Sequence, residues 1–543
     1  MKRIVIIGGV AGGMSAATRL RRLDPTASII VIERSGYVSY ANCGLPYFVG
    51  GVISERQDLL LQTPESLHNR FRLDVRILSE VTGIDRLAKN LTVKNLVDGH
   101  SYDLPYDYLV LSPGAYPIVP PLPGIERALT LRTIEDVTKM ANAVNANPSH
   151  AVVIGGGFIG VETAENLVHR GISTTLIEAM DQVLAPLDPE MAQPVADELR
   201  NHGIDVRLGS GLSAVTETGV ELANGDRVDA DLIILAIGVK PDTTLAKAAD
   251  VAVGPRGGIV VDGFNRTSDP SIYAIGDAAE KSDALDGEAV LVPLANIANR
   301  QGRVVADHIM ERNVREVPTI GTAIVKVFDL VVATTGWNEK RLKSAGRSFV
   351  VLHSHPGSHA GYYPGAESMM LKLLIDADSG QILGAQGVGR EGVDKRIDVI
   401  ATAMRAGITA PELADLELAY APPFGSAKDP VNMLGYMADN ILSGLTASVQ
   451  WSQLADRMAK GATVVDVRSP AEFASGHIPG AINVPVDDLR ERFNELPSTN
   501  VIVYCKVGQR GHTAATLLGE LGVEAKNLDG GYQTWVNSPA ARG

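Results

Sequence analysis

The chain has 543 residues with a formal net charge of −14, and 45% of its residues are hydrophobic. These values exclude a disordered or fibrous protein, and the negative charge argues against nucleic acid or an anionic membrane as a partner. At roughly 100–200 residues per domain, the length predicts about three or four domains. No stretch of about 18 consecutive apolar residues predicts a membrane-spanning helix.

Only two cysteines occur in the chain, Cys43 and Cys505, and they cannot build a disulfide framework. Such usage is typical of a reducing cytosol, where a lone cysteine is either an inert core residue or a reactive thiol. The apolar run at residues 4–7 ends at glycines and is too short for a signal peptide. We therefore expect a cytoplasmic protein.

One strand–helix–strand pattern occurs twice, with its copies about 147 positions apart. Each copy starts with a short apolar strand, passes through a glycine-rich turn into a helix, and ends its second strand at a glutamate. The pattern predicts an α/β fold with two Rossmann-like nucleotide-binding domains. The expected elements are strands 4–7 and 28–32 with helix 13–23, then strands 151–154 and 173–177 with a helix to residue 169, and chain crossings at 108–114 and 231–238.

The second glycine turn matches the dinucleotide-binding pattern G-x-G-x-x-G in full, between an expected strand and an expected helix. Glu178 follows 18 residues after Gly160 and can accept the two hydroxyls of a ribose. An acid at this place favours NADH, and NADPH stays open as a second donor. The residues expected to bind NAD(P)H are Gly155, Gly157, Phe158, Ile159, Gly160, Glu162, Glu178 and Gly238.

The first glycine turn is less regular, because Val10 stands where the pattern has its middle glycine, while Gly8 and Gly13 fit. Glu33, 20 residues after Gly13, supports the same interpretation. Residues 267–277 read TSDPSIYAIGD. With this segment and the two glycine turns, the chain resembles the FAD-dependent pyridine nucleotide–disulfide oxidoreductases.

The resemblance implies that the first turn binds FAD, the second binds NAD(P)H, and Asp277 contacts the ribitol of the flavin. Residues 112–114, Ser-Pro-Gly, resemble the Ala-Thr-Gly crossover of that family with two substitutions. The residues expected at the FAD are Gly8, Gly9, Gly13, Glu33, Arg34, Asn42, Ser112, Gly114 and Asp277.

The surroundings of Cys43 narrow the family. Dithiol members carry a second cysteine four or five residues later, where this chain has Tyr47 and Phe48. The segment SYANCGLPY instead resembles the single-cysteine branch, which contains coenzyme A-disulfide reductases, NADH oxidases and NADH peroxidases. Peroxidases and many oxidases carry a histidine in the first glycine turn, and this chain has Val10 and Ala11 there. A nucleophilic thiol at Cys43 needs a lowered pKa, and oxidised flavin can accept electron density from a thiolate.

The coenzyme A group of this branch carries tyrosines that reach the cysteine of a partner subunit, which implies a homodimer. The segments AGYYP and LAYAPPF match that pattern, and Tyr362 and Tyr420 are the expected proton donors, with Tyr363 as the alternative to Tyr362. Arg19 and Arg22 share a helix face, which the resemblance assigns to coenzyme A phosphates. Some relatives use a lysine near Phe71, for which Arg70 or Arg72 would substitute. The expected coenzyme A contacts are Arg19, Arg22, Ser39, Asn42, Cys43, Arg70, Asn299 and Arg303.

The last 95 or so residues resemble the rhodanese domain, through DVR at 466–468, EF at 472–473 and GHIPGAIN at 476–483. Cys505 begins a Cys-x4-Arg loop, whereas phosphatases use the wider Cys-x5-Arg loop, so this loop is sized for sulfur. Backbone N–H groups, Lys506 and Arg510 would stabilise a thiolate or persulfide at Cys505. The loop residues are Cys505, Lys506, Val507, Gly508, Gln509 and Arg510.

The predicted domains are an FAD-binding domain in two parts (1–112 and 241–318), an NAD(P)H-binding domain (113–240), an α+β dimerisation domain (319–441), a linker (442–449) and an α/β rhodanese domain (450–543). The resemblance implies an enzyme that passes electrons from NAD(P)H through FAD and Cys43 to coenzyme A disulfide, coenzyme A persulfide or polysulfide. Cys505 would collect sulfur and present it to coenzyme A. The alternatives are a water- or peroxide-forming NADH oxidase, a rhodanese-type sulfurtransferase and a non-enzymatic sulfur sensor. We expect no metal site.

Overall fold

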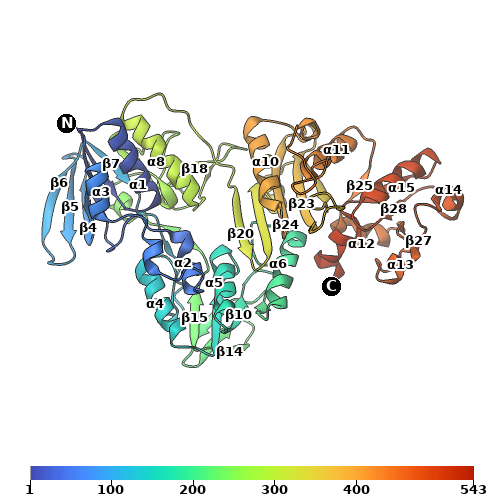
Figure 1. The fold of residues 1–543 in the computed structure, drawn as a ribbon, viewed down its shortest axis with the longest axis horizontal. Helices are drawn as coiled ribbons and strands as arrows, with labels where there is room; N and C mark the ends of the chain where they lie inside the picture. Colours follow the sequence, from blue (N-terminus) through green and yellow to red (C-terminus); the bar gives the residue numbers. More distant parts are fainter. Residues whose placement is uncertain (1, 543) are drawn as a thin grey trace. The chain divides into compact units, whose positions relative to one another are not determined.

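The computed structural model describes residues 2–542, which form two compact units (Figure 1). The first unit contains residues 2–179 and 203–320, and the second contains residues 180–202 and 321–542. Within residues 2–542, every helix is too short or too polar to cross a membrane.

The first sheet of the first unit is parallel, with strand order β17-β7-β1-β2-β3. Side chains alternate across β1, so Ile4 and Ile6 pack toward the helices α1 and α8 while Val5 and Ile7 pack toward an antiparallel β-meander. The elements are β1 (Arg3–Ile7), α1 (Ala11–Leu23), β2 (Ser28–Ile32), β3 (Asp74–Arg76), β7 (Tyr108–Leu111), β17 (Ile272–Ala274) and α8 (Ala295–Ile309), with the meander β4 (Ser79–Asp85), β5 (Asn90–Asn95) and β6 (Ser101–Pro105).

The second sheet repeats this architecture, with parallel strands in the order β11-β10-β9-β15. A three-stranded sheet packs on one of its faces. The chain passes between the two halves of the unit through β8 and β16, which pair antiparallel directly after the two predicted crossing runs. The elements are β8 (Ala115–Pro117), α4 (Ile134–Asn145), β9 (His150–Ile154), α5 (Phe158–His169), β10 (Ser173–Ile177), β11 (Asp205–Arg207), β12 (Leu212–Val215), β13 (Gly219–Leu222), β14 (Arg227–Asp229), β15 (Leu232–Leu235) and β16 (Val239–Pro241).

The second unit begins its main part with an antiparallel sheet in the order β20-β21-β24-β23-β22. Leu371 and Leu373 on β23 face the core shared with α10 and α11, while the alternate residue Lys372 faces α6. The elements are α6 (Pro189–Asn201), β20 (Ala323–Val327), β21 (Leu330–Gly336), β22 (Phe349–Ser354), β23 (Met369–Asp376), β24 (Ile382–Gly389), α10 (Val393–Ala406) and α11 (Pro430–Leu442).

The C-terminal part of the second unit is a parallel sheet in the order β25-β29-β28-β26-β27. Helix α15 packs on one face, and α12 and α16 pack on the other. The elements are β25 (Ser448–Val449), α12 (Trp451–Ala459), β26 (Thr463–Asp466), β27 (Ile482–Asn483), β28 (Val501–Tyr504), α15 (Gln509–Glu520), β29 (Ala525–Leu528) and α16 (Gly531–Val536).

Two details differ from the sequence expectation. The segment expected as a linker, residues 442–449, ends in the strand β25, which pairs with β29. Residues 180–202, expected within the NAD(P)H-binding domain, group with the second unit instead. The reason is tertiary packing, because α6 packs against β20 and β24, and Asp188 before α6 and Glu190 on it bind Lys372.

Candidate functional site

A cavity of about 880 Å³ opens in the first unit where β1 and β7 end. Ligands of parallel α/β sheets bind at this carboxyl edge, so the location is that expected of a cofactor site. Both the first glycine turn and Cys43 line the cavity. Its lining includes Gly8, Gly12, Glu33, Arg34, Asn42, Cys43, Ser112, Gly114, Arg132 and Asp277.

The first glycine turn brings α1 close to the strand end. Gly8 has φ +100°, and a Cβ on it would lie 2.0 Å from the carbonyl oxygen of Ser112. A Cβ on Gly13 would lie 1.9 Å from the oxygen of Gly8. Glu33 accepts a hydrogen bond from the Gly9 N–H at 2.8 Å, and burial raises the pKa of its carboxyl. No side chain caps α1, so its first N–H groups can bind the pyrophosphate of FAD, and these residues fit that cofactor.

The second glycine turn has the same construction. Gly155 has φ +109°, and a Cβ on Gly160 would lie 1.8 Å from its carbonyl oxygen. Gly157 caps α5 without a side chain, and a Cβ there would project into open space. Glu178 accepts a hydrogen bond from the Gly156 N–H at 2.7 Å, which places its carboxylate beside the turn. The geometry fits a dinucleotide whose pyrophosphate lies at the helix N-terminus.

Cys43 lies in a short 3-10 helix, Asn42–Gly44, and is exposed to the cavity. The following helix α2 (Leu45–Val49) contacts α5, which carries Glu162. Burial and the charge of Glu162 raise the pKa of the Cys43 thiol, against a lowering by Arg132. The protein's own groups thus act against the lowered pKa expected from the sequence, because burial and the charge of Glu162 outweigh the opposing effect of Arg132 on the Cys43 thiol.

Glu162 and Tyr47 form a pair beside Cys43 that the sequence did not reveal. The Tyr47 hydroxyl donates to Glu162 Oε1 at 3.1 Å. Burial raises the pKa of Glu162 to about 7, although the hydrogen bond from Tyr47 lowers it. Glu162, expected as a nucleotide contact, can therefore hold or release a proton near neutral pH.

Arg132 is a second residue that sequence reasoning missed. Its guanidinium donates to Asp277 Oδ2 at 2.6 Å and to the carbonyl oxygen of Ala115 at 3.2 Å. Asn42 donates from its side-chain amide to the Arg132 carbonyl oxygen at 3.3 Å. Arg132 follows no motif, and only the fold shows that it joins Asp277 to the neighbourhood of Cys43.

The residues expected to bind coenzyme A divide into two groups. Arg19 donates twice to Asp307 Oδ1, at 2.9 and 2.6 Å, and Arg303 lies 3.6 Å from the same carboxylate. The Asp307 carboxylate therefore already pairs with Arg19 and lies near Arg303, and neither arginine lines the described cavity. Arg22 does line it and stacks on Phe71 at 5.3 Å. The expected residues that line the cavity are Arg22, Ser39, Asn42, Cys43, Arg70 and Asn299.

Four exposed tyrosines lie on the described part of the second unit, among them the two expected proton donors. The hydroxyls of Tyr362 and Tyr420 are 2.9 Å apart, and 76% of Tyr362 is exposed. Tyr363 instead packs its ring edge against His359, with centroids 5.6 Å apart. This geometry distinguishes Tyr362 from its neighbour, which the sequence could not do.

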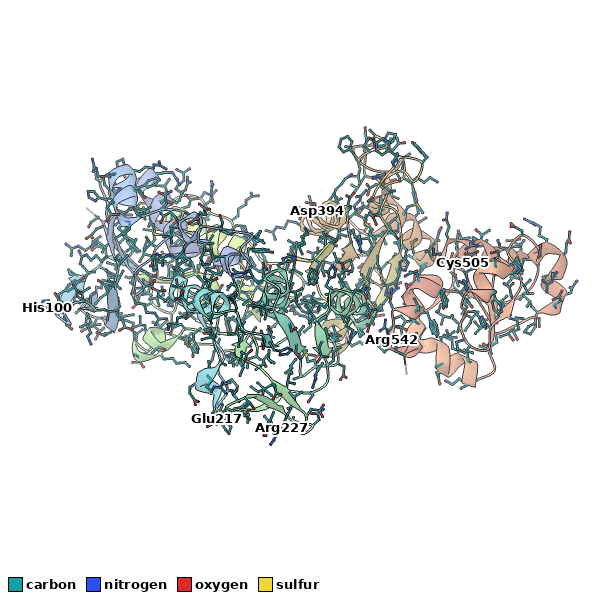
Figure 2. The ribbon with its side chains drawn as sticks, turned by 60° about the horizontal axis from the view of Figure 1, so that its bottom comes forward. His100, Glu217, Arg227, Asp394, Cys505 and Arg542 are labelled. Atoms are coloured by element: carbon teal, nitrogen blue, oxygen red, sulfur yellow. The ribbon has the colours of Figure 1, made fainter. Side chains whose placement is uncertain are left out.

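The Cys505 loop joins β28 to α15, and Cys505 itself is buried and is labelled in Figure 2. The Gly508 N–H donates to its Sγ at 3.2 Å. Arg510, expected to stabilise the sulfur, makes two hydrogen bonds to Glu472, at 2.8 and 2.7 Å. These bonds lower the pKa of Glu472 to about 2, so the charge of Arg510 is shared with a carboxylate. One backbone N–H, that of Gly508, thus faces the sulfur, and Arg510 interacts with both Glu472 and Cys505.

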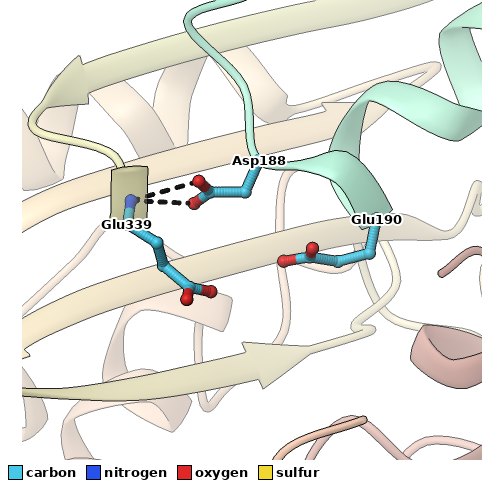
Figure 3. Close-up of side chains that lie close together, drawn as sticks. All are labelled: Asp188, Glu190 and Glu339. Atoms are coloured by element: carbon cyan, nitrogen blue, oxygen red, sulfur yellow. Dashed lines mark hydrogen bonds between the residues drawn. The ribbon is translucent and has the colours of Figure 1, made fainter. Parts of the chain in front are cut away.

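A buried cluster of carboxylates lies in the second unit, formed by Asp188, Glu190 and Glu339 (Figure 3). The ammonium group of Lys372 contacts all three, with Glu339 Oε1 at 2.6 Å and Asp188 Oδ2 at 2.9 Å. The lysine thus occupies the position that a metal ion would need.

Comparisons with known proteins agree with this geometry. Residues 2–317 match the pyridine nucleotide-disulphide oxidoreductases, residues 322–430 match the dimerisation domain of that family, and residues 450–538 match the rhodanese-like domain. The predicted fold class is confirmed.

Among curated relatives, a coenzyme A disulfide reductase of Staphylococcus haemolyticus is 35% identical over 443 residues, which are 81% of this chain and 100% of the relative. One from Staphylococcus aureus is 37% identical over 442 residues, with the same coverage of both chains.

Two solved structures cover nearly the whole chain. Reduced CoADR-RHD of Bacillus anthracis has a TM-score of 0.97 and 49% identity, over 99% of this chain and 98% of that one. An NAD-dependent persulfide reductase of A. fulgidus has a TM-score of 0.92 and 38% identity, over 98% of this chain and 100% of that one. The resemblance inferred from the sequence is therefore confirmed.

Proposed function

Because the chain belongs to the pyridine nucleotide-disulphide oxidoreductase family, we propose that its acceptor is the sulfur–sulfur bond of coenzyme A disulfide, coenzyme A persulfide or polysulfide. The protein is an oxidoreductase that uses FAD and NAD(P)H. One observation carries the proposal: Cys43 lies on the wall of the cofactor cavity, beside cationic side chains, and the chain's other cysteine belongs to a different domain. Because no second cysteine accompanies Cys43 in its domain, the sulfur with which Cys43 forms a disulfide must come from the substrate.

Cys43 supplies the nucleophile in this scheme. Its thiolate attacks one sulfur of the substrate, a new Sγ–S bond forms, and the other sulfur leaves with the electron pair of the broken bond. Gly8, Glu33 and Asp277 line the cavity that would hold FAD, and this cofactor, with NAD(P)H as its reductant, would supply the two electrons needed to cleave the resulting mixed disulfide or persulfide. The substrate sulfur then leaves as coenzyme A thiol or hydrogen sulfide, and Cys43 returns to the thiolate.

Glu162 is one group that can give a proton to a leaving sulfur, alongside the hydroxyls of Tyr362 and Tyr420. Its pKa of about 7 means that it is part protonated at neutral pH, and Tyr47 keeps its carboxyl oriented. Loss of that proton places a negative charge beside Cys43, which raises the pKa of the thiol. Glu162 and Cys43 are thus coupled, and only one of them readily carries the negative charge.

Coenzyme A recognition falls to the side chains that line the cavity. Arg22 and Arg70 provide cations for phosphate, and Ser39, Asn42 and Asn299 provide hydrogen-bonding groups along the path to Cys43. Arg19 and Arg303 would reach a phosphate only in competition with Asp307. We propose Glu178 as the ribose contact that favours NADH over NADPH.

The dimerisation domain indicates a dimer, and we propose a homodimer in which Tyr362 and Tyr420 approach Cys43 of the partner subunit. Their exposure and their shared hydrogen bond support this assignment, because exposed hydroxyls are free to meet a substrate held by another subunit. Either hydroxyl can donate a proton to a departing thiolate.

Cys505 is the sulfur carrier in this proposal. Its thiolate takes sulfane sulfur from a donor and passes it to coenzyme A, whose persulfide is then reduced at Cys43. Both cysteines act as free thiols, so we place the enzyme in the cytoplasm.

Steady-state NADH oxidation with coenzyme A disulfide, coenzyme A persulfide and polysulfide tests the proposal. We expect Cys43→Ser to abolish all three activities, and Cys505→Ser to lower only polysulfide-dependent turnover and sulfide release. A water-forming NADH oxidase of Lactobacillus brevis also shares this fold, with a TM-score of 0.79 and 26% identity. Rapid oxygen consumption without a sulfur acceptor would favour that function, and thiosulfate turnover without NADH would favour a sulfurtransferase.

A further inference from the structure

A polar row crosses three neighbouring strands of the sheet in the dimerisation domain. His353 on β22 lies opposite Lys372 on β23, which in turn lies opposite Gln386 on β24. His353 and Lys372 are fully buried, and Gln386 is 2% exposed. A charge is stable in a protein interior only where other groups pair with it, so the contacts of this row show which groups stabilise its charges.

His353 has a carboxylate at each ring nitrogen. Nδ1 lies 2.6 Å from Asp529 Oδ2, and Nε2 lies 3.0 Å from Glu190 Oε1. Ionised carboxylates only accept hydrogen bonds, so both ring nitrogens must donate, and His353 is an imidazolium. Burial opposes this charge, but Asp529 and Glu190 outweigh it and raise the pKa of His353 to about 9.

The charged and titratable groups that face His353 come from four segments. Glu190 comes from α6, Asp529 follows β29, Lys372 is on β23, and His355 follows β22. Burial lowers the pKa of His355 to about 3, and its Nε2 bonds to the Thr534 hydroxyl at 2.8 Å. His355 is therefore neutral and does not compete with His353 for the carboxylates.

Asp529 directly precedes residues 530–533, which form hydrogen bonds to the Cys505 loop. The Tyr532 N–H donates to the carbonyl oxygen of Cys505 at 2.8 Å, and the Gln533 N–H donates to that of Lys506 at 2.9 Å. A Cβ on the intervening Gly531 would lie 2.4 Å from the Cys505 oxygen. The segment and the loop are therefore in close backbone contact.

We propose that His353 and Asp529 together position the Cys505 loop, so that sulfur transfer at Cys505 depends on a histidine outside the rhodanese-like domain. Asp529 Oδ1 also accepts a hydrogen bond from the backbone N–H of His353 at 3.2 Å, so both carboxylate oxygens of Asp529 are bound to His353. A Cβ on Gly530 would lie 2.7 Å from the His353 Cβ, so the turn is packed directly on the histidine. Both residues are positioning residues, and the proposal rests on the sulfur-carrier role proposed for Cys505.

Two replacements of His353 separate its two contacts. An asparagine amide can stand in for Nδ1–H and a glutamine amide for Nε2–H, so His353→Asn keeps the contact to Asp529 and His353→Gln keeps the one to Glu190. Thr534→Val is the matched control, because it removes the His355 hydrogen bond between the same two domains and leaves Asp529 untouched.

The assay is single-turnover sulfite release by the full-length holoenzyme at saturating thiosulfate. The Cys505 thiolate attacks the outer sulfur, a Sγ–S bond forms, and sulfite leaves with the electron pair of the broken S–S bond. We expect His353→Gln to slow this step at least tenfold, and His353→Asn and Thr534→Val to slow it less than threefold. NADH oxidation with coenzyme A disulfide, which uses Cys43, should stay within twofold in every variant.

A pH profile distinguishes positioning from a purely structural role. The wild-type rate should fall as pH rises through about 9, where His353 loses its proton. Asp529→Asn removes a charge that raises this pKa, so the falling limb should move to lower pH. Equal sulfite release by His353→Gln, His353→Asn and wild type, or an unmoved limb in Asp529→Asn, would overturn the positioning role alone. Absence of sulfite release by the wild type would overturn the sulfur-carrier role along with it.

Discussion

Glu162 on α5 is a partly buried carboxyl whose ionisation the fold makes costly. Burial raises its pKa from 4.5 to about 7. When a group binds its proton more tightly in the folded state, the protein loses stability as pH rises from the pKa of the group in the unfolded state to its pKa in the folded state. At about 1.36 kcal/mol per pKa unit, the ionised form costs about 3 kcal/mol at pH 7.5 and about 1.4 kcal/mol at pH 5.5.

Replacement of Glu162 by glutamine removes this pH-dependent cost. We expect the stability of Glu162→Gln relative to wild type to increase by about 2 kcal/mol between pH 5.5 and pH 7.5. Effects of the substitution that do not depend on pH cancel in this difference. Urea unfolding of the holoenzyme at the two pH values, followed by circular dichroism, measures it.

Tyr47→Phe is the matched control, because it removes a hydrogen bond that lowers the pKa of Glu162 while it leaves the carboxyl in place. This variant should lose more stability than wild type over the same pH range. The same pH dependence in Glu162→Gln and wild type would refute the assignment of the raised pKa. Since the charge of Glu162 raises the pKa of Cys43, Glu162→Gln should also let iodoacetamide alkylate Cys43 faster at pH 8.

Other substitutions test the remaining assignments. Glu178→Ser should raise the KM for NADH about tenfold and lower the preference for NADH over NADPH, measured by steady-state kinetics. Arg22→Ala should raise the KM for coenzyme A disulfide about tenfold, whereas Arg19→Ala, whose guanidinium is paired with an aspartate, should change it less than twofold. Tyr362→Phe should lower kcat about 10- to 100-fold with little change in KM, and an unchanged kcat would assign the tyrosine to packing.

The glycine turns could be predicted because steric constraints are local. At Gly8 and Gly155, a positive φ and a close backbone contact leave no room for a side chain, and that demand is visible in the sequence as a pattern. The Cys505 loop is also a local motif, since the Gly508 N–H that donates to the Cys505 sulfur comes three residues later in the chain. Both motifs depend on contacts between residues that are close in the sequence, and such contacts leave a recognisable sequence pattern.

Pairs between distant residues could not be predicted. Arg19 binds Asp307, which is 288 positions later, and Arg132 binds Asp277, which is 145 positions later. The helix period correctly placed Arg19 and Arg22 one turn apart, but only packing of α1 on α8 decided that Arg19 meets an aspartate. The raised pKa of Cys43 likewise depends on the approach of α5, which no local motif encodes.

The central claim is that Cys43 alone forms a mixed disulfide with a coenzyme A substrate. Holoenzyme with oxidised FAD and a free Cys43 thiol is mixed with coenzyme A disulfide, quenched in acid and digested. The peptide that contains Cys43 should then carry one coenzyme A. NADH should remove that adduct and release one coenzyme A thiol. Absence of an adduct at Cys43, or an adduct that NADH leaves in place, would contradict the account.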